Sequence, residues 1–473
     1  MNDITAIFAF LKYCLGYKRN MSRMIAGMDW QELYSFASKQ ALLGLCFEGI
    51  ERLGKEYSEE LRLNPIGREL LMTWMGKAQQ IRRQNMKVNA VASKLYSMLR
   101  EDGLRCCILK GQGNALIYPN AYSRNPGDID VWVNASRERI MEYAQKKFEL
   151  GDDIRLQHLE TSLDGVPVEL HFFPCSMNNP IYHARLQKWF RRNADLQCSH
   201  IVGLPDGAGD IAIPTTAFNV VYQLTHLYHH FFDEGIGMRQ IIDYYYVVCD
   251  FYKVYQNSSK ITPSLFFDKA SCTRQFESEL SLHSLASLFP LKEGSTSHPD
   301  PLTLRGEGGN RPTRCSEPLR SKDGGPSKVS PDCAGWDRLS IEGDNSAGST
   351  TVVTSYASTT LDVAQRELKY LGLWKFAGAV MYVLKEVLGL SEDKMIVPVD
   401  EKRGRLLLAE ILDGGNFGRH FSKYGGFTHQ SMGKKYFLKI WRNMHFVRYY
   451  PAEVLCEPLF RTWHFFWRLK YKK

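Results

Sequence analysis

The sequence lacks the cysteine spacing that marks a structural zinc site or a dithiol redox centre. Its 473 residues include 11 cysteines, which is an odd number. The cysteines form no Cys-x-x-Cys pair and follow no regular interval. Cys106 and Cys107 lie in a short apolar run, which predicts that they belong to a buried strand. Because the cysteines form no disulfide or metal framework, a reducing compartment is the simplest expectation.

Long uninterrupted apolar runs are also missing. The most apolar long stretch, residues 371–390, contains Lys375, Lys385 and Glu386, which a membrane span rarely tolerates. Residues 1–18 have neither a basic segment ahead of an apolar one nor a small-residue cleavage site, so they predict an amphipathic helix and not a signal peptide. We therefore expect a cytoplasmic protein without a transmembrane segment.

A large excess of one charge is absent as well. The formal net charge of +9 is small for this length and argues against a dedicated nucleic-acid binder. The same charge is compatible with an enzyme that acts on polyanionic substrates such as nucleotides, and equally with an ordinary basic surface. Hydrophobic residues at 44% and charged residues at 23% are ordinary globular values, so the chain is able to bury a sizeable core.

The hydrophobic pattern divides the chain into five regions. Residues 1–100 and 177–290 have apolar residues at helical spacing and predict helical regions. Residues 101–176 change to short apolar and alternating runs, which predict a compact core. Residues 291–360 are rich in Gly, Ser, Thr, Pro and charge, so they predict a low-complexity or disordered insert, or a segment foreign to the fold. Residues 361–473 return to helical spacing.

The order of patterns within the core predicts a small mixed sheet. The expected elements are strands at 106–109 and 128–133 and helices at 114–118 and 137–148. Asp164-Gly165 then separates two alternating runs, which is a strong signal for a β-hairpin. The predicted fold class is therefore α+β, with a small mixed β-sheet core and helical regions N- and C-terminal to it.

Two carboxylates in the second predicted strand are the main chemical feature of the sequence. Side chains alternate between the faces of a strand, so Asp128 and Asp130 share one face while Ile129 points into the core. Two like charges side by side are costly unless a cation or solvent separates them. A divalent ion such as Mg²⁺ takes hard oxygen ligands and bridges substrate phosphates, so it would offset the repulsion between the two carboxylates.

A third carboxylate, Glu169, follows in the hairpin. A turn at Asp164-Gly165 pairs residues whose numbers sum to 329, which places Glu160 opposite Glu169 and His158 opposite His171. Facing carboxylates destabilise a sheet unless water or a metal relieves them. Asp128, Asp130 and Glu169 are therefore the predicted metal ligands, with Glu160 as a competing candidate and His171 as a neighbour that orients or packs against Glu169.

A glycine-containing turn precedes this acidic pair. Lys110, Gly111 and Gly113 lie between a predicted strand and a predicted helix, where backbone N–H groups suit triphosphate oxygens. Lys110 and Arg124 add positive charge to the same predicted pocket, although a basic residue at a strand end is as often simply solvated. The four residues Lys110, Gly111, Gly113 and Arg124 are the predicted nucleotide-binding set.

The run ILKGQGNALIYPNAYSRNPGDIDVWV, with VPVELHFFP after it, resembles the DNA polymerase β-like nucleotidyltransferase superfamily, and most of all an uncharacterised bacterial branch of nucleotidyltransferase family proteins. The runs HLYHHFFDEGIGMRQIIDYYYV and GLWKFAGAVMYVLKEVLGL also resemble that branch. The resemblance implies a polymerase β-like fold, Mg²⁺ or Mn²⁺, and an NTP substrate, with Asp128 and Asp130 as the acidic pair and Glu169 as the third acid. The chain departs from the usual Gly-Gly or Gly-Ser turn at Gln112.

Residues and resemblance together predict transfer of a nucleoside monophosphate from an NTP to an unknown acceptor hydroxyl, with release of pyrophosphate. Asp128, Asp130 and Glu169 are the expected catalytic residues, and Glu169 is expected to help deprotonate the acceptor. Two alternatives stay open, namely a protein side chain as the acceptor and an inactive nucleotide- or partner-binding module on the same fold. Three carboxylates facing one cleft argue against the inactive module.

Two further features have several interpretations. His226 and His230 share one face of a predicted helix, followed by Arg239 and Asp243, but a histidine pair without a third ligand is a weak metal signal. The sequence favours polar residues at a helix interface there, with acceptor binding or a general base as the alternative. The aromatic and basic tail, residues 461–473, predicts a last helix packed on the core, with contact to nucleic acid or a membrane surface as alternatives.

Overall fold

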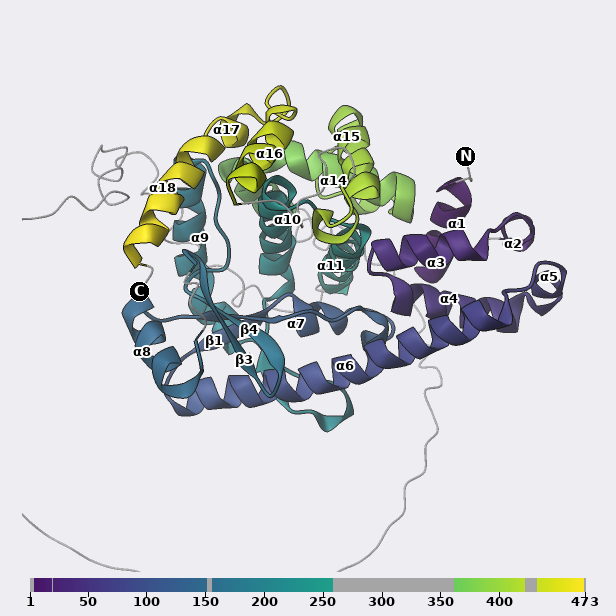
Figure 1. Cartoon of the computed structure of the whole chain (residues 1–473), viewed down its shortest axis with the longest axis horizontal. Coiled ribbons are helices and arrows are strands. Elements are labelled where there is room, and N and C mark those ends of the chain that lie inside the picture. The colour runs from purple at the N-terminus through teal and green to yellow at the C-terminus, as the bar shows by residue number, and fades with distance from the viewer. Residues whose placement is uncertain (1–3, 19, 151–154, 258–360, 422–431, 472–473) are drawn as a thin grey trace, which may run out of the picture. The chain divides into compact units, whose positions relative to one another are not determined.

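The computed structural model describes residues 4–18, 20–150, 155–257, 361–421 and 432–471 (Figure 1). All of these residues belong to one compact unit. The low-complexity stretch expected at 291–360, and the end of the helical region expected up to residue 290, lie outside the described residues. The domain limits expected from the sequence therefore stay a prediction.

The N-terminal region is helical, as the sequence predicts. Its helices are α1 (Ile4–Cys14), α2 (Ser22–Ala26), α3 (Trp30–Lys39), α4 (Leu43–Glu56), α5 (Ser58–Leu63) and α6 (Arg68–Glu101). Pro65 and Gly67 lie between α5 and α6, where the chain leaves the helical conformation. The chain turns between α3 and α4 at Ala41, which has a left-handed φ of 56°.

The core sheet has four strands in the order β1-β2-β4-β3. The strands are β1 (Cys106–Leu109), β2 (Ile129–Val133), β3 (His158–Leu163) and β4 (Val166–His171). β1 is antiparallel to β2, β2 is parallel to β4, and β3 is antiparallel to β4, so the sheet is mixed. The protein is thus α+β, as the sequence predicts.

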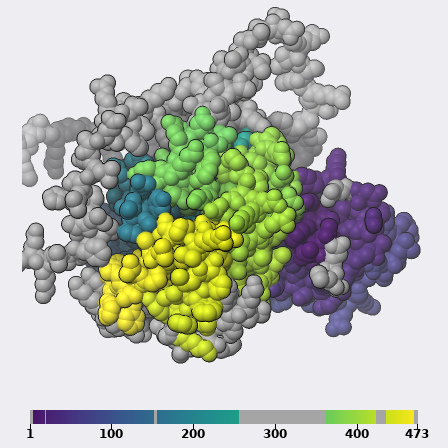
Figure 2. Space-filling model, turned by 90° about the horizontal axis from the view of Figure 1, so that it is seen from above, coloured from purple at the N-terminus to yellow at the C-terminus, as the bar shows by residue number. Residues whose placement is uncertain are grey.

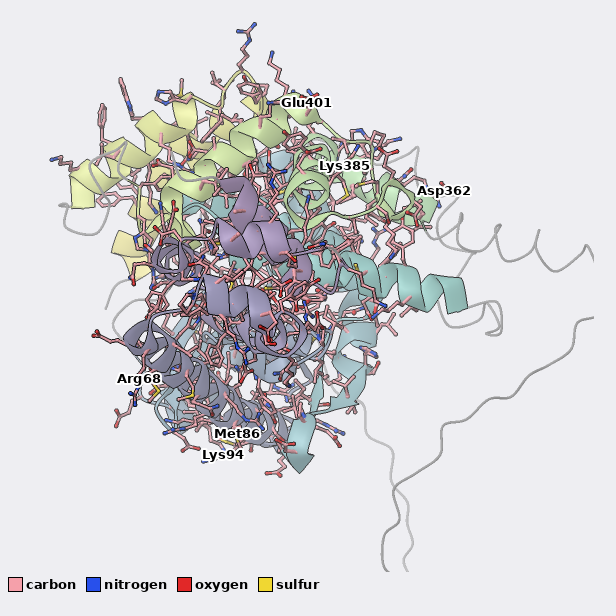
Figure 3. The ribbon with its side chains drawn as sticks, turned by 90° about the vertical axis from the view of Figure 1, so that its right-hand side faces the viewer. Arg68, Met86, Lys94, Asp362, Lys385 and Glu401 are labelled. Carbon is pink, nitrogen blue, oxygen red and sulfur yellow. The ribbon has the colours of Figure 1, made fainter. Side chains whose placement is uncertain are left out.

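One face of the sheet packs on helices. Ile129, Val131 and Val133 are buried in a cluster with residues of α6 such as Leu95, and with Ile140 of α8 (Arg137–Lys147). α6 therefore runs along the sheet beneath it (Figure 1). α6 leaves the sheet toward the N-terminal helices, and at that end its outward side chains reach solvent (Figure 3).

The opposite face of the sheet is partly covered by α9 (Pro180–Ser199) and α10 (Thr216–Asp233). Trp132 of β2 contacts Phe190 of α9 and stacks on Phe218 of α10, with ring centroids 5.9 and 6.2 Å apart. This aromatic packing closes one end of the face. The acidic residues lie on the same face, toward the end at which β2 begins.

Two short elements differ from their predicted positions. The helix expected at 114–118 begins earlier, as α7 (Gly111–Ala115), because the chain turns directly out of β1 at Lys110. Within the region expected to be wholly helical, a second sheet intervenes between α9 and α10. Its antiparallel strands are β5 (Ile201–Gly203) and β6 (Asp210–Ala212). The prediction of continuous helix was wrong there, since each strand has only three residues and shows no clear alternation.

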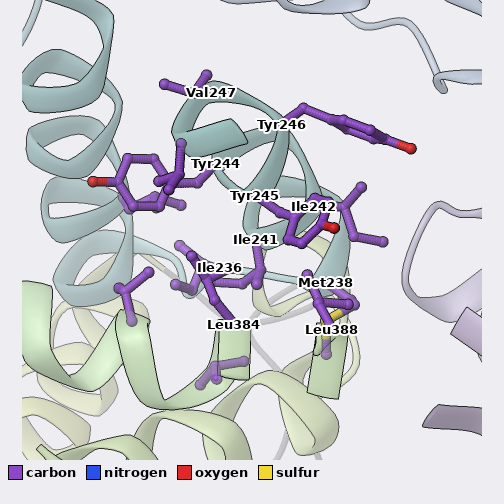
Figure 4. Close-up of a cluster of buried hydrophobic side chains, with 14 of the residues drawn as sticks. Ile236, Met238, Ile241, Ile242, Tyr244, Tyr245, Tyr246, Val247, Leu384 and Leu388 are labelled. Carbon is purple, nitrogen blue, oxygen red and sulfur yellow. The ribbon is translucent and has the colours of Figure 1, made fainter. Parts of the chain in front are cut away.

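The helices after the core form the rest of the unit. They are α11 (Met238–Asn257), residues 361–370, α14 (Trp374–Leu388), α15 (Glu401–Gly414), α16 (Met432–Met444), α17 (Pro451–Val454) and α18 (Glu457–Tyr471). Aliphatic and tyrosine side chains of α11 pack against Leu384 and Leu388 of α14 (Figure 4). From above, the helices near the C-terminus border α14 and α15 (Figure 2).

None of the helices in the described ranges is both long and apolar enough to cross a bilayer. The tail forms a helix, α18, as predicted. Its rings are not all packed on the core, since Phe465 and Phe466 are 53% and 63% exposed.

Candidate functional site

Parallel pairing of β2 with β4 brings the acidic residues together. Asp130 is the register partner of Glu169, and Asp128 lies one residue before β2 on the same face as Asp130. One carboxylate oxygen from each of Asp128, Asp130 and Glu169 lies within 4.8 Å of the other two. The structure therefore gathers the three predicted metal ligands, which are far apart in sequence, into one cluster.

The three carboxylates differ in burial and in electrostatics. Asp130 is buried, Glu169 is partly buried and Asp128 is exposed. The neighbouring Asp130 carboxylate raises the pKa of Asp128 to about 6, because two adjacent negative charges repel each other. Burial alone favours the neutral form of Asp130, but Lys110 and His171 outweigh it and hold the pKa of Asp130 well below its usual range. The two aspartates therefore have separate electrostatic environments.

Lys110 turns into this cluster directly after β1. Its backbone has φ 51° and ψ −131°, which is strained for a residue with a side chain. Its Nζ lies 3.0 Å from Asp130 Oδ1 and donates to His226 Nε2 at 2.6 Å. Burial disfavours the ammonium, but the three carboxylates outweigh it and raise the pKa of Lys110. Lys110 is thus a fixed cation of the site.

His171 is a second cation of the site, on β4. Its Nε2 lies 3.0 Å from Asp130 Oδ1 and 3.1 Å from Glu169 Oε2. Burial disfavours the imidazolium, but hydrogen bonds to the two carboxylates outweigh it and raise the pKa of His171 to about 9. The alternation of β4 predicts that His171 shares the face of Glu169, but the link to Asp130 was missed because it depends on the pairing of β2 with β4.

The predicted hairpin register is confirmed, and the two competing carboxylates, Glu160 and Glu169, have different surroundings. Glu160 pairs with Glu169 and His158 with His171. Arg155 Nη2 lies 2.7 Å from Glu160 Oε1, so an arginine supplies positive charge beside the facing carboxylates, and relief by water or a metal stays a prediction. Glu160 also lies outside the acidic cluster of the described residues.

The glycine turn has a mixed role. Gly111 has a left-handed φ of 38°, and a Cβ there would lie 3.8 Å from the carbonyl oxygen of Asp128. Gly113 faces away from the cluster, because a Cβ on it would lie 3.0 Å from Ile213. Gln112, the residue at which this chain departs from the usual Gly-Gly or Gly-Ser turn, is buried and donates to Asn89 of α6. Gly111 is therefore close to the acidic cluster, whereas Gly113 is required for packing.

Arg124 is engaged elsewhere. Its Nε and Nη2 each donate to Asp243 of α11 at 2.8 Å, and both side chains are buried. Tyr118 donates its hydroxyl to the same carboxylate at 2.7 Å. Arg239 donates to the carbonyl of Asn125 at 3.0 Å. Nucleotide binding by Arg124 stays a prediction, and its observed partners give it a structural role.

The helix α10 contributes two histidines beside the cluster. His226 is buried and accepts from Lys110, and His230 Nε2 lies 2.9 Å from His226 Nε2. His230 Nδ1 is 3.9 Å from Glu234. The sequence favours a helix interface for this pair, and its spacing identifies the shared face. Only the fold shows that this face meets Lys110.

Comparison with known protein families gives a match for the region that holds this cluster. The model of a family described as "Uncharacterised nucleotidyltransferase" matches residues 26–261. The chain belongs to this family. The match covers about half of the chain, from just before α3 to beyond α11, and includes every residue of the acidic cluster with Lys110, His171 and His226.

No curated protein and no solved structure matches the chain. The family assignment therefore rests on the sequence match and agrees with the small mixed sheet flanked by helices. The family description supports nucleotidyl transfer at a general level and names no acceptor.

Proposed function

We propose that this protein transfers a nucleoside monophosphate from an NTP to an acceptor hydroxyl and releases pyrophosphate. The observation that carries the proposal is the convergence of Asp128, Asp130 and Glu169 from two parallel strands, within a region that matches a nucleotidyltransferase family. Carboxylates so close together need positive charge, and nucleotide transfer needs a divalent ion at the phosphates.

The donor set fits Mg²⁺ or Mn²⁺. All three side chains supply carboxylate oxygens, which these hard ions prefer, and their oxygens lie within 4.8 Å of one another. Lys110 and His171 supply two positive charges against three negative ones, so the cluster keeps a demand for a cation. When bound, the ion would polarise the reacting phosphate and offset the charge that develops on it.

The chain's own residues then have separate tasks. Asp128 and Asp130 would hold the ion, and Asp128 is the exposed member of the pair. Glu169 is partly buried in the same cluster, where it would be the third ligand and accept the proton of the acceptor hydroxyl. Lys110, whose ammonium contacts Asp130, would offer positive charge to the triphosphate, and Gly111 would leave room for the substrate because it has no side chain.

The acceptor hydroxyl belongs either to a small molecule or to a protein side chain. A binding module without activity is the non-enzymatic alternative, and the cost of keeping three carboxylates together argues against it. Incubation of the protein with labelled NTP and a cell extract, followed by mass spectrometry, separates the two kinds of acceptor. A protein that carries the label indicates a protein acceptor, and a labelled small molecule indicates a small-molecule acceptor.

The first test is release of pyrophosphate from each of the four NTPs with Mg²⁺ or Mn²⁺, with extract as the acceptor source. Asp128→Asn, Asp130→Asn and Glu169→Gln should each lower the rate by at least about 100-fold, since each removes an ionic ligand. Glu160→Gln is the matched control on the neighbouring strand and should keep the rate within about threefold. The proposal fails if the wild-type protein shows neither release nor metal-dependent NTP binding by calorimetry.

A further inference from the structure

A second group of possible ligands lies beside the acidic cluster. His158 of β3 and His171 of β4 face each other across the hairpin, and the carboxylate of Glu169 lies beside both rings. One ligand atom from each of His158, Glu169 and His171 lies within 4.8 Å of the other two. This group has two imidazoles and one carboxylate, whereas the first has oxygen donors alone.

The ring of His158 is the unusual member of the group. Its side chain is only 9% exposed, and neither Nδ1 nor Nε2 has a hydrogen-bond partner. Nδ1 lies 3.3 Å from Glu169 Oε2 and Nε2 lies 3.6 Å from Glu160 Oε1, but neither contact has hydrogen-bond geometry. A buried imidazole without partners is costly, so its position needs an explanation.

The spacing of the donor atoms suits a small four-coordinate ion. Zinc-class ions bind nitrogen and oxygen ligands at about 2.0–2.1 Å, so neighbouring ligands in a tetrahedron lie roughly 3.3 Å apart. Glu169 Oε2 is 3.3 Å from His158 Nδ1 and 3.1 Å from His171 Nε2. Both separations match a tetrahedral edge, and the 4.9 Å between the two ring centroids places the imidazoles side by side.

We propose that His158, His171 and Glu169 bind a transition-metal ion of the Zn²⁺ or Co²⁺ type, at a position separate from the oxygen-only group. Imidazole nitrogens favour such ions over Mg²⁺, and Glu169 is shared between the two positions. Binding at Nε2 of His171 replaces the proton that joins it to Asp130 and Glu169, and that proton is released to solvent. The inference goes beyond the proposed transfer and does not depend on it.

The histidines of α10 are the main competing site. His226 Nε2 already accepts from Lys110, and within the described residues the pair with His230 belongs to no group of three metal-ligating side chains. A cation beside His226 would also meet the ammonium of Lys110. The group around His158 has instead a carboxylate as its third ligand.

The test uses the full chain, untagged and freed of metal, titrated with Co²⁺ and followed by its visible absorption. We expect one Co²⁺ per chain with the strong bands of a four-coordinate site, displaced by Zn²⁺ but not by millimolar Mg²⁺. His158→Gln should weaken this binding by at least about 100-fold, because it removes a ligand. His200→Gln removes an imidazole outside the group and is the matched control, so it should leave the binding unchanged.

A second measurement needs no substitution. Wild-type protein with ¹⁵N-labelled histidine is loaded with Co²⁺ and studied by pulsed electron paramagnetic resonance at low temperature, where the nitrogen coupling should change with the isotope. No nitrogen coupling together with unchanged Co²⁺ affinity in His158→Gln would overturn the proposal, and loss of affinity only in His226→Gln would assign the metal to α10.

A further variant keeps this result apart from the nucleotide proposal. Asp128→Asn changes only the oxygen group, so it should keep the Co²⁺ bands while pyrophosphate release is lost. If the bands persist in wild type but no NTP is turned over, the transition-metal site stands and the transferase proposal fails. If pyrophosphate is released but no Co²⁺ bands appear, the transferase proposal stands and the transition-metal site fails.

Discussion

The buried ion pair between Arg124 and Asp243 gives the sharpest prediction about stability. Both side chains are less than 8% exposed, and two hydrogen bonds of 2.8 Å join them. Asp243→Leu removes the carboxylate and leaves the guanidinium buried without its partner, beside Arg239. Breaking one side of such a pair costs about 3–5 kcal/mol, so we expect the free energy of unfolding to fall by that amount.

The double variant Arg124→Met/Asp243→Leu should recover most of this loss. It removes both charges, and what then stays is mainly the hydroxyl of Tyr118, which loses its acceptor at a cost of about 1–2 kcal/mol. Urea unfolding followed by circular dichroism measures all the variants. Glu59→Gln breaks the exposed pair of Glu59 with Arg62, and as the control it should change the stability by less than about 1 kcal/mol.

Two results would refute this reasoning. One is a loss in Asp243→Leu no larger than in the surface control, which would mean that the pair is not desolvated in solution. The other is a double variant as unstable as the single one, which would place the cost in packing and not in charge. NTP binding by the double variant then tests the predicted nucleotide role of Arg124, and binding unchanged within about twofold assigns the residue to structure.

Two more predictions concern pH and packing. Burial raises the pKa of Glu453 from 4.5 to about 7, although the backbone N–H groups of residues 178 and 179 oppose this shift. The folded state therefore binds the proton of Glu453 more tightly than the unfolded state. The resulting contribution to the free energy of unfolding is full below pH 4.5 and is lost as the pH rises through 7. Glu453→Gln should remove up to about 3 kcal/mol of this pH dependence, measured as urea stability at pH 5 and pH 8. A Cβ on Gly404 would lie 2.2 Å from Tyr382, so Gly404→Ala should lower the melting temperature by several degrees. Gly76 lies in the middle of α6, where a Cβ would meet nothing within 4 Å, so Gly76→Ala should raise the melting temperature. Equal shifts in the two variants would contradict the close contact between residue 404 and Tyr382.

Local rules were sufficient for the elements that depend on neighbouring residues. The hairpin register followed from Asp164-Gly165, whose φ values of 49° and 71° are those of a two-residue turn that twists with its strands. The face shared by Asp128 and Asp130 followed from strand alternation, and Ile129 is buried on the opposite side as predicted. Each of these features is decided within about ten residues of chain.

The features that were missed depend on contacts between distant segments. Lys110 meets His226 across 116 residues of sequence, and His171 meets Asp130 across 41. The short strands β5 and β6 pair with each other over three residues, which is too few for alternation to be visible. For the two side-chain contacts the residue types were noticed, but no local pattern specifies which distant side chain meets which.

The charges of the site show why its arrangement is stable before any ion binds. Three carboxylates brought together by β2 and β4 repel one another, and in a partly buried cluster that repulsion opposes the pairing of the strands. Lys110 and His171 each contact Asp130, the most buried of the three, so the fold places its own cations where solvent screens least. Among the described residues, no hydrogen bond or ion pair joins the exposed Asp128 to a positively charged side chain. The remaining negative charge therefore faces solvent, where a cation is able to reach it.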